Sequence, residues 1–333
     1  MKKLINRPED FVDETLEGIL AAHPDQLRTV GPDLRAIVRA DAPGEGRVGI
    51  VTGGGSGHLP LFLGYVGRGL ASGVAVGNVF SSPSSEQIFD ATMGVSGGAG
   101  VLHLFGNYGG DVLNFELAAD LADAEGVEVA TVITTDDVTS APAEEREERR
   151  GVAGMFFAYK CAGAAAEEGA SLEEVAAVAS AANDATRTMG VGLSPTILPA
   201  AGEPTFTLAE GEMEIGIGIH GEPGIQRGQL RPADEIVDEL LEHILGDLPG
   251  GPSDDVAVLV NGMGATPKEE LYVLFRRVHQ RLADTPLRIH RAYVGEYATS
   301  LEMAGASLSI MRLDDRLRRH LDAPAHSPFF EQS

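Results

Sequence analysis

The chain has 333 residues, a length that predicts two domains, and 43% of them are hydrophobic, enough to fill sizeable cores. Its formal net charge of −25 argues against nucleic-acid binding, because phosphate contacts require clustered positive charge. No apolar run approaches the roughly 20 residues of a membrane span, and residues 1–7 lack the apolar stretch of a secretory signal. The single cysteine, Cys161, excludes an intrachain disulfide and a cysteine-built zinc site. A reducing, cytoplasmic location is therefore expected.

The first part of the chain predicts alternating strands and helices. Short apolar runs predict strands at 48–52, 74–80, 101–105 and 127–134. Helices are expected at 59–70 and 111–124. Buried strands joined by crossover helices predict a mostly parallel sheet covered by helices, whose ligands gather at the C-terminal ends of the strands.

The pattern changes after two long helices predicted between residues 150 and 188. Gly169 suits the C-cap of the first, and Ser171 with Glu174 makes a capping box for the second. Beyond them, extended segments are predicted at 190–198, 213–219, 256–261, 288–294 and 307–313, with helices at 233–245 and 267–282. We therefore expect two α/β domains: residues 1–186, and a smaller domain of residues 187–333 with a mixed sheet. The C-terminal tail is expected to pack back on the first domain.

A glycine-rich loop at 53–58 follows the first predicted strand and ends in His58. Such loops usually indicate phosphate or a dinucleotide, but a P-loop needs Gly-Lys-Ser/Thr and this chain has Gly57-His58-Leu59. A dinucleotide fingerprint needs a third glycine at position 58 and an acid about 20 residues later. No Asp or Glu occurs between Glu45 and Glu86. Both nucleotide interpretations are therefore weak.

Other polar groups are expected near this loop. Residues 80–83 offer hydroxyls and amides after a strand, and Asp111 starts a helix after the next strand, as a capping acid or as a general base. Asp136 and Asp137 are interpreted as capping or turn residues. A second bare loop, Gly218-Ile219-His220-Gly221-Glu222-Pro223-Gly224, presents a histidine to any small molecule that approaches.

These motifs together resemble a known family. The strings at 53–58, 80–83, 107–115 and 218–224 resemble the ketose-binding subunit of dihydroxyacetone kinases, in the same order and spacing over almost the whole chain. Further matching stretches are 149–153, 199–202, 261–267 and 323–326.

The resemblance implies roles for individual residues. His220 would add to the carbonyl carbon of a short ketose as a hemiaminal, so that glycerol is rejected, and His58 would hydrogen-bond and polarise the substrate. Asp111 would accept the proton of the attacking hydroxyl. The resemblance also places a set of substrate-binding residues around the ketose, namely Gly54, Gly55, Gly57 and Ser82.

The resemblance further implies that this chain carries no nucleotide of its own. Phosphoryl transfer needs a donor site with Mg²⁺ and a positive clamp, and none is evident here. In the family, ADP recharged by a phosphocarrier chain of the phosphotransferase system, or exchangeable ATP, sits on a separate helical subunit or domain. A homodimer is expected from the resemblance alone. The remaining histidines show no metal-ligand spacing, so no metal is assigned.

Two departures from the family and two rival functions stay open. Leu59 stands where many members have glutamate, and Gly106 where many have a lysine that contacts substrate. Loss of that lysine removes a cation and frees volume, which predicts a wider pocket for a four-carbon ketose such as erythrulose; an unchanged substrate is the alternative. The rivals are a non-catalytic ketose-binding coactivator, which the presence of His58, Asp111 and His220 disfavours, and a dinucleotide-dependent oxidoreductase, which the missing acid disfavours.

The excess of carboxylates predicts adaptation to high salt. Only four lysines occur in the chain, so arginine supplies most of the positive charge. High ionic strength screens the repulsion among the acids. Ordinary acidic solubility is the alternative interpretation.

Overall fold

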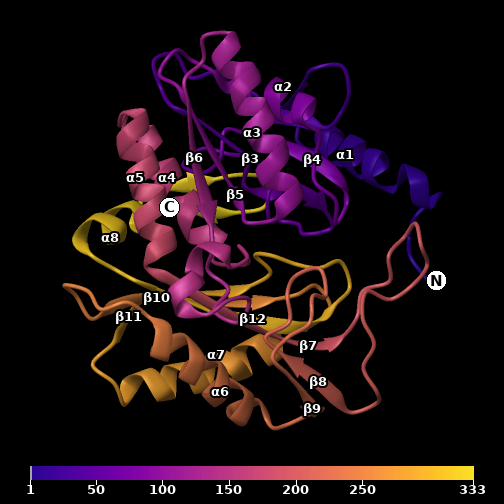
Figure 1. The fold of residues 1–333 in the computed structure, drawn as a ribbon, viewed down its shortest axis with the longest axis vertical. Helices are drawn as coiled ribbons and strands as arrows, with labels where there is room; N and C mark the ends of the chain where they lie inside the picture. Colours follow the sequence, from indigo (N-terminus) through magenta and orange to yellow (C-terminus); the bar gives the residue numbers. More distant parts are fainter. Residues whose placement is uncertain (1) are drawn as a thin grey trace.

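The computed structural model describes residues 2–333, whose helices and sheets are arranged in layers (Figure 1). The helices longer than three residues are α1 (Phe11–Ala22), α2 (Ser85–Val95), α3 (Gly109–Ala124), α4 (Met155–Glu167), α5 (Leu172–Asp184), α6 (Ala233–Asp247), α7 (Lys268–Ala283) and α8 (Asp315–Asp322), with a 3₁₀ segment at Ala143–Glu148. Shorter 3₁₀ turns occupy Pro8–Asp10 and Leu63–Tyr65.

Two six-stranded sheets hold most of the strands described within residues 2–333. The first has the order β1-β2-β4-β3-β5-β6, with strands β1 (Leu27–Val30), β2 (Ala36–Arg39), β3 (Gly49–Ser56), β4 (Gly73–Val79), β5 (Val101–Gly106) and β6 (Val129–Thr134). The second has the order β11-β10-β12-β7-β8-β9, with strands β7 (Thr186–Ser194), β8 (Glu212–Ile215), β9 (Gln226–Gln229), β10 (Asp255–Gly262), β11 (Arg288–Gly295) and β12 (Ala304–Arg312). A short hairpin, β13 (Ala325–His326) and β14 (Glu331–Gln332), ends the chain.

The fold class predicted from the sequence is confirmed. In the first sheet, β4, β3, β5 and β6 are parallel neighbours, whereas β1 pairs antiparallel with β2 and β2 antiparallel with β4. The second sheet is mixed, since β10 and β11 are parallel and the other pairs antiparallel. Helices α2 and α3 cover one face of the first sheet, α4 and α5 lie between the sheets, and α6 and α7 cover the far face of the second (Figure 1).

The helix predicted at 59–70 is wrong. Only one 3₁₀ turn forms there, because Pro60 and three glycines in this stretch disfavour a continuous helix. Gly67 also has to pack directly on the backbone of Ser327, so the segment is shaped by the C-terminal tail. The capping box of Ser171 and Glu174 is confirmed, and Gly169 follows α4 with a φ of +81°.

Strand β9 and helix α8 were not predicted from the sequence, and neither was the terminal hairpin of β13 and β14. Strand β9 is polar and mostly exposed, and only its pairing with β8 makes it a strand. Helix α8 is one short amphipathic segment that buries Leu317 and Leu321 in the largest core cluster. Its last carbonyls accept hydrogen bonds from the ammonium of the buried Lys160, at 3.0 Å from His320 and 2.5 Å from Ala323.

One core cluster spans the two halves of the chain. It joins the first sheet, α1, α4 and α5 to side chains of the second sheet and of α8. The second sheet and its own helices, α6 and α7, form a separate cluster. The division of the chain at residues 186 and 187 stays a prediction, because no gap in the packing marks it.

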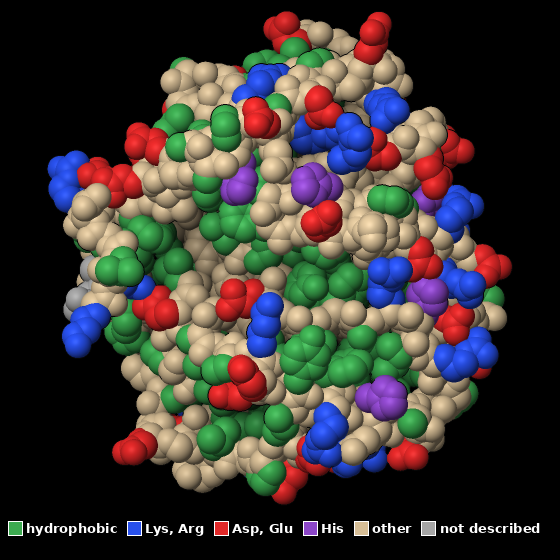
Figure 2. Space-filling view, turned by 180° about the vertical axis from the view of Figure 1, so that it is seen from behind, with side chains coloured by type: hydrophobic (Ala, Val, Ile, Leu, Met, Phe, Trp, Pro, Cys, Tyr) green, Lys and Arg blue, Asp and Glu red, His purple; other side chains and the backbone are tan. Residues whose placement is uncertain are grey.

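The surface mixes charges of both signs. On the face shown in Figure 2, acidic and basic side chains lie beside one another, and arginines of α7 pair with acids of α6, as in the ion pairs Arg276–Asp234 and Arg277–Asp238. Adaptation to high salt stays a prediction. Among residues 2–333, no helix is long and apolar enough to cross a membrane.

Candidate functional site

The glycine-rich loops meet the histidine loop of the second half at one edge of the first sheet. The C-terminal ends of β3, β4 and β5 lead into the segments that carry His58, Ser82 and Asp111. The loop after β8 brings His220 to the same place, with the ring centroids of His58 and His220 4.8 Å apart. The edge predicted for ligands therefore gathers all three predicted reactive side chains.

The glycines at 54–57 are required because neighbouring backbone and aromatic rings lie where a side chain would stand. The sequence predicted a loop at residues 53–58, but most of this segment is the end of β3. A Cβ on Gly55 would lie 2.6 Å from the amide nitrogen of Ser81, and one on Gly54 would overlap the ring of Phe62. Gly57 has a φ of +105°, which side-chain-bearing residues rarely adopt. These glycines let β4 and its following turn close over the strand end.

Backbone strain is concentrated around this loop. Among the described residues, the non-glycine residues with positive φ are Phe62 (65°), Phe80 (54°) and Leu301 (50°). Each packs on the glycine segment or on His58: the ring of Phe80 stacks on His58 at 4.8 Å, and Leu301 donates its amide to the carbonyl of Gly57. Such strain persists only where surrounding structure holds it, and it is common at functional sites.

His58 is a buried neutral imidazole with one free nitrogen. Its Nδ1 lies 2.7 Å from the carbonyl oxygen of Thr299, so Nδ1 carries the hydrogen and donates it. Burial, and secondarily the nearby His220, lowers the pKa of His58 to about 3. Its Nε2 is buried and finds no partner among residues 2–333. His58 can therefore accept a hydrogen bond from a ligand hydroxyl.

His220 is oriented by Glu222. Its Nδ1 lies 2.8 Å from Oε1 of Glu222, and the same carboxylate accepts the His220 amide at 2.9 Å. The hydrogen on Nδ1 leaves the Nε2 lone pair free as a nucleophile. The ring is bounded edge-on by Tyr108 at 4.9 Å and Phe80 at 5.3 Å, centroid to centroid. Glu222 was not among the residues predicted to form the site, although it lies two residues from His220 in the motif.

A chain of charges continues from Glu222 into the first half of the molecule. Burial acts to raise the pKa of Glu222, but His220 and then Arg150 outweigh it and lower that pKa to about 2. Arg150 lies 3.8 Å from Glu222 and holds Asp137 at 2.8 Å. Asp137 thus combines the predicted turn role, through Thr139, with support of the histidine loop. The other predicted turn residue, Asp136, accepts the amides that precede α4.

Asp111 lies in the first turn of α3, one face of which is buried. The N-cap residue is Tyr108, so Asp111 is a first-turn acid rather than the cap itself. Burial raises the pKa of Asp111 to about 6, although a hydrogen bond with Ser82 and the proximity of His220 oppose this rise. Its Oδ1 is buried without a partner among the described residues. A carboxylate with this pKa is suited to accept a proton near neutral pH.

The extra volume expected at Gly106 is filled. A Cβ on Gly106 would lie 3.1 Å from the ring of Tyr108 and 3.2 Å from the methyl carbon of Met155. The tyrosine ring that borders His220 therefore packs over the glycine. The other departure, Leu59, contributes its carbonyl to the hydroxyl of Thr299, whose own carbonyl holds His58.

The arrangement defines a small-molecule site with a nucleophile, a buried acceptor and a base. Two buried polar atoms of these residues have no partner among residues 2–333, His58 Nε2 and Asp111 Oδ1, whereas buried polar atoms normally have partners. Among residues 2–333, no group of three metal-ligating side chains forms. Arg150 borders the site but is already paired with Asp137. By its fold and this site, the chain is a two-sheet α/β protein with a histidine-centred ligand site.

Comparison with known proteins identifies the family. The chain matches the Dak1 domain over residues 17–329. It is 44% identical over 331 residues to the dihydroxyacetone-binding subunit DhaK of the PTS-dependent dihydroxyacetone kinase 2 of Listeria innocua, covering 99% of each chain. It is 45% identical over 332 residues to the D-erythrulose kinase of Mycolicibacterium smegmatis, covering all of this chain and 57% of that protein.

Solved structures agree with this result. The dihydroxyacetone kinase of C. freundii superposes with a TM-score of 0.89 at 31% identity, over 99% of this chain and 60% of that chain. The dihydroxyacetone kinase operon co-activator DhaQ superposes with a TM-score of 0.88 at 32% identity, over 96% of this chain and 98% of that chain. The chain belongs to the Dak1 family and is a DhaK-type subunit.

Proposed function

We propose that this chain binds a short ketose for phosphorylation by a separate nucleotide-bearing subunit. The observation that carries the proposal is the pairing of a free His220 Nε2 with two unpartnered acceptors, His58 and Asp111, in one site. The relatives named for dihydroxyacetone and erythrulose kinases support a phosphotransferase acting on an alcohol group.

The first step is the capture of the ketose carbonyl. The lone pair on His220 Nε2 forms a bond to the carbonyl carbon, the carbonyl π bond breaks, and its oxygen takes a proton from water. The positive charge that develops on the imidazole is stabilised by the carboxylate of Glu222 at Nδ1. Because the bond requires a carbonyl, glycerol is rejected although it has similar hydroxyls.

The second step is activation of a terminal hydroxyl. The Nε2 of His58 accepts a hydrogen bond from a substrate hydroxyl and fixes the bound ketose. Asp111, with its pKa raised to about 6, accepts the proton of the hydroxyl that attacks phosphorus.

The nucleotide is proposed to sit on a partner rather than on this chain. A phosphoryl donor needs several cationic groups or Mg²⁺ around its phosphates, and supplies the phosphoryl group once bound. Arg150, which borders the site, is engaged by Asp137 and Glu222. We therefore assign ADP or ATP with Mg²⁺ to a separate helical subunit, and we expect this chain to be a homodimer.

The test is a crystal soaked with dihydroxyacetone, beside one soaked with glycerol. Continuous density between the ketone carbon and His220 Nε2, with no bound glycerol, is the expected result. In the matched variant His220→Ala, we expect kcat/KM with the partner subunit to fall by about 10³-fold or more, as when other covalent nucleophiles are removed. Discrete, non-bonded ketose density would contradict the hemiaminal.

Erythrulose is a second candidate substrate. The chain is 45% identical to an erythrulose kinase and 44% identical to a dihydroxyacetone-binding subunit, so sequence identity does not distinguish the two substrates. The filled space at Gly106 argues against extra room at that position. Side-by-side kinetics with both ketoses and a nucleotide subunit decide between them. Tight ketose binding without turnover would instead favour a coactivator.

A further inference from the structure

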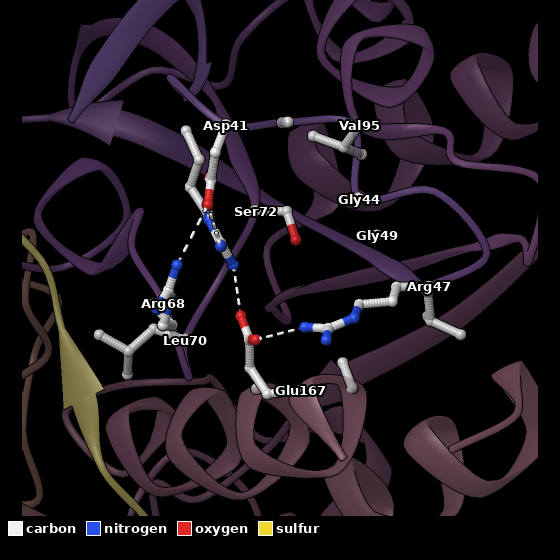
Figure 3. Close-up of a pocket in the computed structure, with 14 residues that line it drawn as sticks. Asp41, Gly44, Arg47, Gly49, Arg68, Leu70, Ser72, Val95 and Glu167 are labelled. Carbon is white, nitrogen blue, oxygen red and sulfur yellow. Dashed lines mark hydrogen bonds and ion pairs between the residues drawn. The ribbon is translucent and has the colours of Figure 1, made fainter. Parts of the chain in front are cut away.

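A second cavity lies at the opposite edge of the first sheet, where β3 and β4 begin (Figure 3). Its volume is about 130 Å³. The end of β2, the loop before β3, the turn before β4 and the last turn of α4 form its walls. Three arginines from separate segments converge on it: Arg39, Arg47 and Arg68. This convergence is unusual for a chain with a net charge of −25.

Arg39 is the fixed member of this cluster. Its guanidinium donates to both oxygens of Asp41, each at 2.8 Å, and to Glu167 at 2.6 Å. Its side chain is 17% exposed, and the flanking hydrogen bonds raise its pKa although burial acts against them. Arg39 with the two acids therefore forms a rigid frame that carries one net negative charge.

Arg47 and Arg68 each form an ion pair with one of these acids and make the local charge positive. Arg47 donates one nitrogen to Glu167 at 2.7 Å, which aims the guanidinium at the cavity and leaves its other N–H groups free among the hydrogen bonds of residues 2–333. Arg68 approaches Asp41 only at 3.7 Å, beyond hydrogen-bond distance. In Figure 3 the two side chains lie on opposite sides of the cavity. The three arginines and two acids sum to a local charge of +1.

The floor of the cavity favours a small polar anion. The oxygen of Ser72 points inward (Figure 3) and accepts the amide hydrogen of Ile50 at 3.1 Å, which leaves its hydroxyl hydrogen available to a ligand. The apolar side chains of Val48, Leu70 and Val95 also line the cavity. A shallower hollow of about 430 Å³ shares Arg39, Asp41 and Arg68 and opens beside it.

We propose that this cavity binds the phosphoryl group of a small phosphate compound, separately from the ketose site. Arg47 and Arg68 approach the cavity from opposite sides, and the N–H groups that their acidic partners leave free match the oxygens of a phosphate, which arginine binds through several N–H groups at once. A volume of about 130 Å³ admits a phosphate group and excludes a nucleotide. The source is inorganic phosphate or a short phosphomonoester whose organic part extends into the adjoining hollow.

The test is isothermal titration calorimetry at low ionic strength with inorganic phosphate and with glycerol 3-phosphate. The second probe lacks a carbonyl, so it cannot form a bond to His220. Saturable binding of one equivalent is expected, at least tenfold weaker in the double variant Arg47→Ala/Arg68→Ala, since each charged hydrogen bond is worth about that factor. Both side chains are more than half exposed, so the variant is expected to fold, which a thermal melt verifies.

Two controls separate this cavity from other sources of binding. Arg288→Ala removes a 71% exposed arginine on the second sheet and should leave the affinity unchanged, as should His220→Ala. Tighter binding of glycerol 3-phosphate than of phosphate identifies a phosphomonoester as ligand, and equal affinity identifies the phosphate group alone. Absence of saturable binding, equal loss in Arg288→Ala, or loss in His220→Ala would each overturn the proposal.

Discussion

The two edges of the first sheet differ in whether their buried polar and charged groups have partners. At the C-terminal edge, Asp111 and His58 are buried with free polar atoms, and the backbone around them is strained. At the N-terminal edge, Glu167 is paired with Arg39 and Arg47. A site that reacts has to keep polar groups unsatisfied until its substrate arrives, whereas a site that holds charge can pair its acids in advance. Removing an acid should therefore have opposite consequences at the two edges.

The largest expected effect is that of Asp111→Asn on turnover. Loss of the base should lower kcat/KM by about 10²–10⁴-fold. In the wild type, kcat/KM should rise with pH through about 6 as Asp111 loses its proton, while His58, with a pKa of about 3, stays neutral. A pH–rate profile with the partner subunit measures both. An unchanged inflection in Asp111→Asn would assign the titration to another group.

The same variant should stabilise the fold. The pKa of Asp111 is higher in the folded state than its ordinary value of 3.8, so its contribution to stability is complete below that value and is lost as pH rises through about 6. At pH 7–8, Asp111→Asn should raise the free energy of unfolding by about 1–3 kcal/mol, and the gain should vanish below pH 4. Urea titrations at several pH values test this sign.

The next effect is that of a single methyl group at Gly55. Gly55→Ala places a Cβ 2.6 Å from the backbone nitrogen of Ser81, so the turn that carries Ser82 must move. A shift of this kind should reduce kcat/KM by about 10²-fold. Gly109→Ala is the matched control, because no atom lies within 4 Å of its Cβ position. Equal losses of kcat/KM in both variants would show that the contact between position 55 and Ser81 does not determine activity.

A smaller effect is expected at Glu222. Glu222→Gln retains an oxygen to accept the Nδ1 hydrogen of His220 but removes the charge that stabilises the imidazole during addition. The loss in kcat/KM should be about 10–100-fold, the value of one charge-assisted hydrogen bond. Glu235→Gln, an exposed change on α6, is the control. Activity within twofold of the wild type would remove Glu222 from the addition step.

The smallest effect is expected at the N-terminal edge. Glu167→Gln breaks the half-buried ion pairs with Arg39 and Arg47 and should lower the free energy of unfolding by about 0.5–1 kcal/mol. The loss should shrink in high salt, which screens such pairs. Denaturation at two salt concentrations gives both values. Stabilisation by Glu167→Gln, as expected for Asp111→Asn, would remove the difference between the edges.

The sequence by itself determined the fold class and the capping of α5, and it singled out the three side chains that the structure brings together, His58, Asp111 and His220. Apolar periodicity and capping chemistry are local, so they could be read at Ser171 and Glu174 without a structure. Local patterns failed at residues 59–70 and at β9, where packing against the C-terminal tail and pairing with β8 override propensity.

Only the tertiary structure decided how the reactive groups are tuned. The neutral state of His58 depends on burial and its tautomer on Thr299, the orientation of His220 on Glu222, and the raised pKa of Asp111 on burial. The tertiary structure also packs Tyr108 over Gly106 and brings arginines from separate segments to the second cavity. Distances, desolvation and charge pairing arise between residues far apart in the chain, and these are what set the chemistry of each site.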